Sequence, residues 1–377
     1  MRRIAALLLA CPASSCHAFV LPRPTPPPAR LPSALAARKG AMARRKKHRP
    51  PSDAADPDGG GGFGPVTDGD DGSAEPGSIY SMPPLYDLAF GYRDYGEEVD
   101  FLLDAHRRHT SPDGGGAAGT PGPVDVLELA AGPARHSLAA LSERPPTEVR
   151  SATALDLSSD MVRYGLENAD AELGAPGGGR RDDFAYVAGD MRRVADSTGG
   201  RGFDTAWLLL GSMQHLLTND DVLSCLGSVH SSLRDGGTMV IELPHPRETF
   251  SMGECTRNGW TVPLVEDDGE GDEREYGELR IVWGDDGDDF DPIAQVRRFT
   301  VGLELTVEDG AEVPEGMEGR SGVREVVPMR LFTMQEIDAL ARCAGFEVAD
   351  RHGALEDGVP IDGEDEAFRM VCTLRKV

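Results

Sequence analysis

The protein has 377 residues, enough for one large α/β domain with extensions or for two small domains. Its charge is unevenly divided. Residues 1–52 hold 11 Lys or Arg and no acid, while residues 53–377 hold 27 basic and 64 acidic residues, a net charge of −37. A body this acidic repels a phosphate backbone, so the composition argues against nucleic acid as a partner.

Residues 1–78 have the composition of targeting and linker segments. An arginine pair precedes the apolar run IAALLLA, which is too short to span a bilayer, and residues 1–18 are predicted to be a cleavable signal peptide. The acid-free segment 19–52 is transit-like, and together the two resemble the plastid presequence of algae with red-derived secondary plastids. This resemblance implies a plastid location; the alternative is a secretory signal followed by a basic tail. Residues 53–78 are predicted to be a disordered linker.

From residue 79 the sequence is predicted to fold. An aromatic-rich helical segment comes first, with Val99, Leu102 and His106 on one helix face. Strands alternating with helices follow as far as residue 244, which implies a parallel sheet with right-handed crossovers. The strands are predicted at 124–130, 151–157, 184–191, 203–211 and 237–244, and the helices at 135–143, 158–173 and 218–233.

The stretch 251–330 is acidic and rich in loops, yet it contains β-type alternation. Three runs, at 277–286, 294–307 and 324–333, predict a small antiparallel sheet. The acidic run DDGDD within this stretch has no metal-ligand spacing and is predicted to be a solvated loop.

The last part of the chain returns to the first sheet. Thr333 and Glu336 have the spacing of a capping box, which predicts a helix that ends at Gly345. The runs 346–355 and 367–377 predict two antiparallel strands at the sheet edge.

Three successive strands of the predicted parallel sheet end in an acid: Glu128, Asp156 and Asp190. Ligands of open parallel sheets bind beyond the carboxyl ends of the strands. A carboxylate there can accept hydrogen bonds from ribose hydroxyls or an exocyclic amine, and Met191 can pack on an adenine ring. The first acid opens ELAAGPARH, where Gly132 and small neighbours let backbone approach a ligand. The G-x-G-x-x-G fingerprint and the Walker loop are absent, which disfavours a dinucleotide.

This order of acids resembles class I S-adenosylmethionine-dependent methyltransferases, over roughly residues 79–377. The resemblance implies an α/β fold with a Rossmann-like seven-stranded sheet, mostly parallel with an antiparallel last hairpin, and a β insertion at 251–330 that caps the substrate. It implies S-adenosylmethionine as the cofactor, with its methionine on the first turn, its ribose on Asp156 and its adenine on Asp190. The implied cofactor-binding residues are Glu128, Ala130, Gly132, Asp156, Leu157, Met161, Asp190, Met191 and Leu210. Ala130 and Ala134 replace the outer glycines of the family's first motif, E/D-x-G-x-G-x-G.

The layout is most similar to small-molecule members of the family, such as amino-sugar N,N-dimethyltransferases and glycine or sarcosine methyltransferases. The shared features are an N-terminal Y-D…Y lid beginning at Tyr86, a polar-x-x-x-His-Leu element containing His215, and an FT-x-x-E helix start at 332–336. The resemblance implies that Tyr86 and His215 lie beside the accepting atom. It favours nitrogen over oxygen or carbon as that atom. With an ordinary pKa near ~6.5, His215 could act as a base at neutral or alkaline pH.

Several interpretations remain open at this stage. Arg93, Arg135, His136 and Trp283 could contact the substrate, although a surface or packing role is favoured for each. A catalytically inactive methyltransferase-like binding or assembly protein of the organelle is the alternative function, and a nicotinamide-dependent reductase is the alternative enzyme. The predicted partner is a small-molecule methyl acceptor, without nucleic acid or, for the mature form, a membrane. The oligomeric state is not predicted.

Overall fold

The computed structural model describes residues 78–110, 122–249, 258–267 and 273–377, apart from nine single residues between Asp286 and Asp365. The predicted signal peptide, the basic segment and all of the linker except Ser78 lie outside the described residues. Within the described part, no helix is long and apolar enough to cross a membrane.

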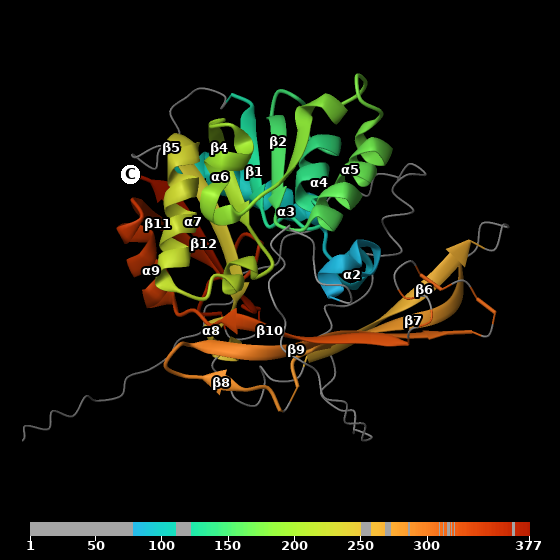
Figure 1. Cartoon of the computed structure of the whole chain (residues 1–377). Helices are drawn as coiled ribbons and strands as arrows, with labels where there is room; N and C mark the ends of the chain where they lie inside the picture. The colour runs from blue at the N-terminus through green and yellow to red at the C-terminus, as the bar shows by residue number, and fades with distance from the viewer. Residues whose placement is uncertain are drawn as a thin grey trace, which may run out of the picture. The chain divides into compact units, whose positions relative to one another are not determined.

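A seven-stranded sheet, called sheet A, forms the centre of the fold (Figure 1). Its strands are β1 (Val124–Leu129), β2 (Val149–Asp156), β3 (Phe184–Ala188), β4 (Phe203–Leu208), β5 (Leu233–Pro244), β11 (Phe346–His352) and β12 (Arg369–Lys376). They lie in the order β11-β12-β5-β4-β1-β2-β3. All six residues of β1 are buried, as expected for a central strand covered on both faces.

The predicted fold class is confirmed. β1 to β5 are parallel, and β12 pairs antiparallel with both β5 and β11. The predicted last hairpin is therefore present, with β11 at the sheet edge and β12 inserted between β11 and β5.

Helices cover both faces of sheet A and bury two separate apolar cores. The helices of the described chain are α2 (Pro83–Phe90), α3 (Tyr95–His109), α4 (Arg135–Ser142), α5 (Ser159–Leu173), α6 (Val194–Thr198), α7 (Asn219–Ser232), α8 (Pro246–Thr249) and α9 (Met334–Cys343). One core holds Leu138 of α4 and Leu102 of α3, and the other holds Leu226 of α7 and Ile337 of α9. The predicted capping box opens α9, because Thr333 accepts from the Glu336 backbone N–H at 3.2 Å.

A second, antiparallel sheet, called sheet B, is built from the predicted insertion. Its strands are β6 (Asn258–Asp267), β7 (Glu273–Trp283), β8 (Phe290–Asp291), β9 (Val296–Val307) and β10 (Gly322–Arg330), and β10-β9-β7-β6 is the main order. The sequence interpretation missed β6, whose run NGWTVPLVED contains a glycine and a proline that weaken the strand pattern. In the DDGDD loop, Asp288 accepts hydrogen bonds from Thr300 of β9, so this part of the loop is anchored to sheet B.

Candidate functional site

The turn between β1 and α4 follows a left-handed backbone path. Ala130, Gly132 and Ala134 have φ angles of +47°, +53° and +59°. An L-residue in this region costs about 1–2 kcal/mol relative to the right-handed form, which is why glycine usually occupies it. The two alanines therefore keep the path that glycines would take, and they add only a methyl group at each position. This turn is called the 130–134 turn below.

Side chains from two neighbouring strands fix the middle of the 130–134 turn. The Gly132 N–H donates to Oδ2 of Asp156 at 2.8 Å, and the hydroxyl of Tyr186 on β3 donates to the Gly132 carbonyl. The turn is thus held from the carboxyl end of β2 and the middle of β3, next to the carboxylate predicted to bind ribose.

Replacing Ala130 with glycine is expected to stabilise the protein, whereas the same change at Ala134 should be close to neutral. Ala130→Gly relieves the cost of a left-handed alanine at a half-buried site, but glycine also adds entropy to the unfolded chain. We therefore expect the free energy of unfolding to rise by about 0.5–1 kcal/mol. The Ala134 methyl is fully buried, and losing it costs about 0.8 kcal/mol, which cancels the gain. Chemical denaturation of both variants measures this difference. Equal changes in the free energy of unfolding of the two variants would contradict the prediction that Ala130→Gly stabilises the protein by relieving backbone strain.

Glu128 and His136 form a buried charged pair beneath the 130–134 turn. The Glu128 carboxylate accepts from the Ser137 backbone N–H at 2.9 Å and lies 3.4 Å from Nδ1 of His136. Nε2 of His136 lies 2.8 Å from Glu98 of α3. Burial by itself would lower the pKa of His136, but hydrogen bonds with the two carboxylates outweigh it and raise the pKa to about 9. Glu128 therefore holds the start of α4 beneath the turn.

This pair predicts a loss of stability at alkaline pH. His136 has a pKa of about 9 when folded and an ordinary value of 6.5 when unfolded, so its stabilisation is complete below pH 6.5 and is lost as the pH rises to about 9. The expected loss in the free energy of unfolding is on the order of 3 kcal/mol. Urea unfolding at pH 6.5 and pH 9 measures it. His136→Gln should be less stable at pH 6.5 and should show little further loss at pH 9; an unchanged pH dependence in this variant would contradict the assignment.

Asp156 keeps acceptor capacity at the end of β2. Its two oxygens accept from the backbone N–H groups of Gly132 and Ser158 at 2.8 and 2.9 Å, and a carboxylate has about four lone-pair positions. Burial raises the pKa of Asp156, although these N–H groups act in the opposite direction. Of its predicted neighbours, Leu157 is 64% exposed and Met161 is buried, so only Leu157 is open to contact a ligand from outside.

Asp190 follows β3 as predicted, but its carboxylate is already engaged. It accepts from the backbone N–H of Arg192 at 2.8 Å and forms an ion pair with the Arg192 side chain, which also pairs with Asp221 of α7. These bonds lower the pKa of Asp190 in spite of partial burial. Met191 packs against the core beside it. Any ligand of Asp190 therefore shares the carboxylate with Arg192.

Leu210 is held at the end of β4 by a residue that the sequence analysis missed. Its φ is +55°, and its N–H donates to Oε2 of Glu242 at 2.9 Å. Glu242 is 1% exposed and also pairs with Arg93, which lies between α2 and α3, at 3.1 Å and with Arg369 of β12 at 3.2 Å. Burial would raise the pKa of Glu242, but the two arginines and the Leu210 N–H lower it. Arg93 is therefore packed in the interior, with its side chain 6% exposed, which is one of the two roles, surface or packing, expected for it.

The lid is tied to the 130–134 turn by an ion pair. The lid comprises the short 3-10 helix Ile79–Ser81 and α2. Helix α2 lies between sheet A and sheet B (Figure 1). Asp87 of α2 is 8% exposed and accepts from Nε of Arg135 at 2.9 Å and from the Tyr164 hydroxyl at 2.9 Å. Arg135 is the first residue of α4, so the pair joins the lid directly to the end of the turn.

Three aromatic side chains form a row across the site. The ring centroids of Tyr86 and Tyr80 lie 5.8 Å apart, and those of Tyr80 and His215 lie 5.9 Å apart. The Tyr80 hydroxyl lies 3.4 Å from Nε2 of His215. The structure thus brings Tyr86 and His215 to one row, as expected, but places Tyr80, which the sequence analysis did not single out, between them.

Protonation states along this row follow from its surroundings. Burial raises the pKa of both Tyr80 and Tyr86, and the nearby Asp156 carboxylate adds to the effect, so both hydroxyls remain protonated. The His215 ring is open to solvent on one side but surrounded by protein elsewhere, and this desolvation lowers its pKa. His215 is therefore neutral at pH 7 and can accept a proton.

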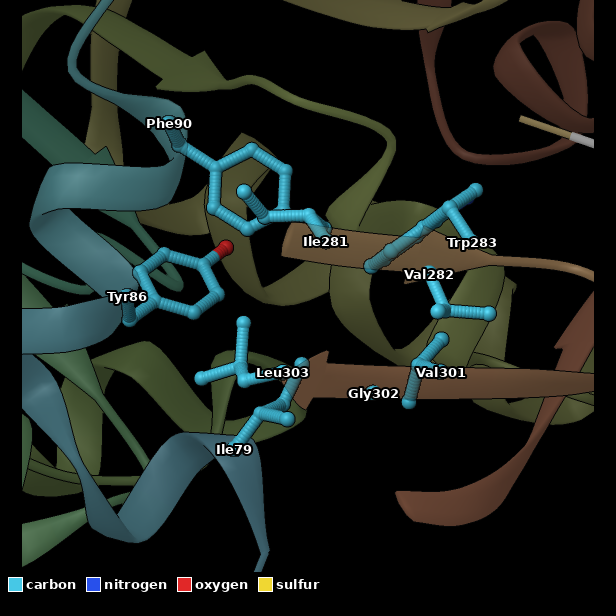
Figure 2. A pocket seen from close by; sticks show the side chains of 9 residues that line it. All are labelled: Ile79, Tyr86, Phe90, Ile281, Val282, Trp283, Val301, Gly302 and Leu303. Carbon is cyan, nitrogen blue, oxygen red and sulfur yellow. The ribbon is translucent and has the colours of Figure 1, made fainter. Parts of the chain in front are cut away.

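Two hollows meet at Tyr86 and Phe90. The first has about 30 Å³ of room for water, with Tyr86, Asp87 and Tyr95 on one side and residues 128–131, Pro133, Arg135, His136, Leu209 and Leu210 on the sheet A side. The second lies between the lid and sheet B and has no room for a water molecule (Figure 2). Trp283 lines it and stacks edge-on against Phe90 at 5.7 Å, which makes it part of the hollow's wall.

The fold is similar to that of solved S-adenosylmethionine-dependent methyltransferases. Solved structures with similar folds include an S-adenosylmethionine-dependent methyltransferase from Clostridium acetobutylicum (14% identity, 78% of this chain and 96% of that chain, TM-score 0.54). Others are the sugar N-methyltransferase KedS8 from Streptoalloteichus (18%, 85% and 100%, TM-score 0.52) and the methyltransferase CcbJ from Streptomyces caelestis (17%, 76% and 97%, TM-score 0.51). The sequence matches no protein-family model and no curated protein.

Proposed function

We propose that the protein transfers a methyl group from S-adenosylmethionine to a small-molecule acceptor, with nitrogen favoured over oxygen or carbon as the accepting atom. The observation that carries this proposal is the left-handed 130–134 turn, held by Asp156 and facing Tyr86 of the lid. A Cβ atom placed on Gly132 would lie 3.7 Å from Cε1 of Tyr86, so the lid closes directly over this turn.

The residues around the first hollow fit S-adenosylmethionine. Small side chains at 130–134 leave the backbone free to face the methionine part of the cofactor, and Asp156 has acceptor capacity for ribose hydroxyls. Leu157 offers an exposed apolar surface beside them. Asp190, shared with Arg192, and Met191 would receive the adenine. When bound, the cofactor would supply an electrophilic methyl carbon on a sulfonium.

The remaining work of the site would be alignment, exclusion of water and removal of one proton. The lid, fixed by Asp87 and Arg135, closes the first hollow and would hold the two reactants at attack distance. Tyr80 and Tyr86 are protonated and would donate hydrogen bonds to the acceptor. Neutral His215 would take the proton that an amine acceptor loses. This base fits nitrogen best, because an alcohol is far more weakly acidic than an ammonium ion.

Calorimetric titration of the full-length protein tests the proposal. We expect S-adenosylmethionine to bind and NAD not to bind, and we expect tritium from the labelled methyl group to appear in amines of an algal metabolite extract. Binding of NAD in place of S-adenosylmethionine would favour the reductase. Binding of S-adenosylmethionine without any transfer of label would favour an inactive binding or assembly protein.

The proposed location is a secondary plastid, supported by the signal-like residues 1–18 and the acid-free segment 19–52. A fusion of residues 1–52 to a fluorescent protein, expressed in an alga with such a plastid, tests it. Fluorescence in the plastid is expected, and export to the medium would favour the secretory alternative.

A further inference from the structure

The second hollow adds information about the acceptor. Its lid side is formed by Ile79, Tyr86 and Phe90, and its floor by Ile281 and Trp283 of β7 with Val301 and Leu303 of β9 (Figure 2). Trp283 pairs with Val301 and Ile281 with Leu303 across the two strands, so these four side chains share one face of sheet B. The walls are apolar, and with the lid closed the hollow is too narrow for a water molecule.

Tyr86 and Phe90 line both hollows, so the junction between donor and acceptor lies at these two residues. Within the described residues the Tyr86 hydroxyl has no hydrogen-bond partner, and in Figure 2 it points toward Phe90 and Ile281. A molecule that approaches a donor on the 130–134 turn from the side of sheet B therefore passes this apolar wall.

The described residues that line the two hollows offer no unpaired cation. Arg135 is paired with Asp87 and Glu172, and His136 lies between Glu128 and Glu98. A phosphate or carboxylate placed in the second hollow would lose its water without gaining a counter-charge, which disfavours its binding there.

The same surroundings suit a positive charge. Aromatic rings attract cations and are the usual means of recognising alkylated ammonium groups. Here Phe90 packs on Tyr86 at 4.6 Å and against Trp283 at 5.7 Å. An amine and its methylated product would thus meet aromatic faces.

From these contacts we infer that the acceptor is an amine with an apolar body and without a phosphate or carboxylate group. The inference rests on the proposed function and specifies its substrate class. The apolar body lies between α2 and sheet B, and the amine faces Tyr86, which lines both hollows. Entry requires α2 to move away from sheet B, because the closed hollow is dry and narrow.

Calorimetry on the full-length protein saturated with S-adenosylhomocysteine tests this inference with two probes of similar size and opposite charge. We expect phenethylamine to bind at least ten times more tightly than 3-phenylpropionate. Equal or tighter binding of the carboxylate would overturn the inference, and so would failure of both probes to bind. Glucosamine 6-phosphate is a third probe, and tighter binding of this phosphorylated amine than of phenethylamine would also overturn it.

The affinity of two variants for phenethylamine tests whether this amine binds in the second hollow. Trp283→Ala removes an aromatic part of the wall of the second hollow and is expected to weaken phenethylamine binding about tenfold or more while leaving S-adenosylhomocysteine binding unchanged. Tyr276→Ala, on the same strand but outside the lining of the hollow, is the matched control and should change neither. Equal amine affinity in both variants would place the amine elsewhere. Failure of the wild type to bind S-adenosylhomocysteine would reject the proposed function itself, which distinguishes the two failures.

Discussion

Asp156→Ala is expected to raise the Kd of S-adenosylmethionine by about 100-fold or more. The carboxylate would accept charge-assisted hydrogen bonds from two ribose hydroxyls, each worth about 1.5–3 kcal/mol, and 1.4 kcal/mol corresponds to a factor of ten. The substitution also removes the acceptor that holds the Gly132 N–H, so the 130–134 turn loses its tie to β2. Calorimetric titration of the wild type and the variant measures the effect.

Two further measurements sharpen this expectation. Asp160→Ala is the control, because Asp160 lies on α5 just past Asp156 and contacts the exposed Arg163; its Kd should equal that of the wild type. Burial raises the pKa of Asp156, so wild-type affinity should begin to fall at a higher pH than an ordinary aspartate would give as the solution is acidified. An unchanged Kd in Asp156→Ala would show that the cofactor does not bind at the end of β2.

Features that depend on a few adjacent residues could be predicted from the sequence. The capping box at Thr333 and Glu336 requires a spacing of three residues, and the strand-end acids follow short apolar runs that any parallel sheet would bury. The alternation of strands and helices predicts the parallel arrangement of β1 to β5, but not the order of the strands in sheet A. These signals are local, so propensity and periodicity are enough to detect them.

The contacts that fix the site are not local. Arg93 and Glu242 are 149 residues apart, and Asp87 and Arg135 are 48 apart, so no pattern in the chain indicates that they pair. Tyr80 was missed because Ser81 follows it, so it lacks the Y-D pattern that marks Tyr86, and only the folded chain places it beside His215. In contrast, the effect of alanine at the outer glycine positions of the 130–134 turn could only be stated once the φ angles were known.

Glu242→Ala is expected to lower the free energy of unfolding by about 3–5 kcal/mol, the usual cost of removing one partner from a buried ion pair. The variant leaves the buried Arg93 with Glu98 alone and removes a partner of Arg369. It also leaves the Leu210 N–H without its acceptor at the edge of the first hollow. Urea unfolding at pH 7 measures the loss. The affinity for S-adenosylmethionine should fall as well, because the turn after β4 is no longer held.

Glu304→Ala is the matched control. Glu304 pairs with Arg280 at 2.9 Å across sheet B, but both side chains are exposed, and surface pairs of this kind contribute about 0–1 kcal/mol. A much larger loss in the free energy of unfolding for Glu242→Ala than for Glu304→Ala would show that the Glu242–Arg93 pair stabilises the protein because it is buried. Similar small losses would mean that water replaces Glu242 around Arg93, and that the lid does not depend on this ion pair for its position over the 130–134 turn.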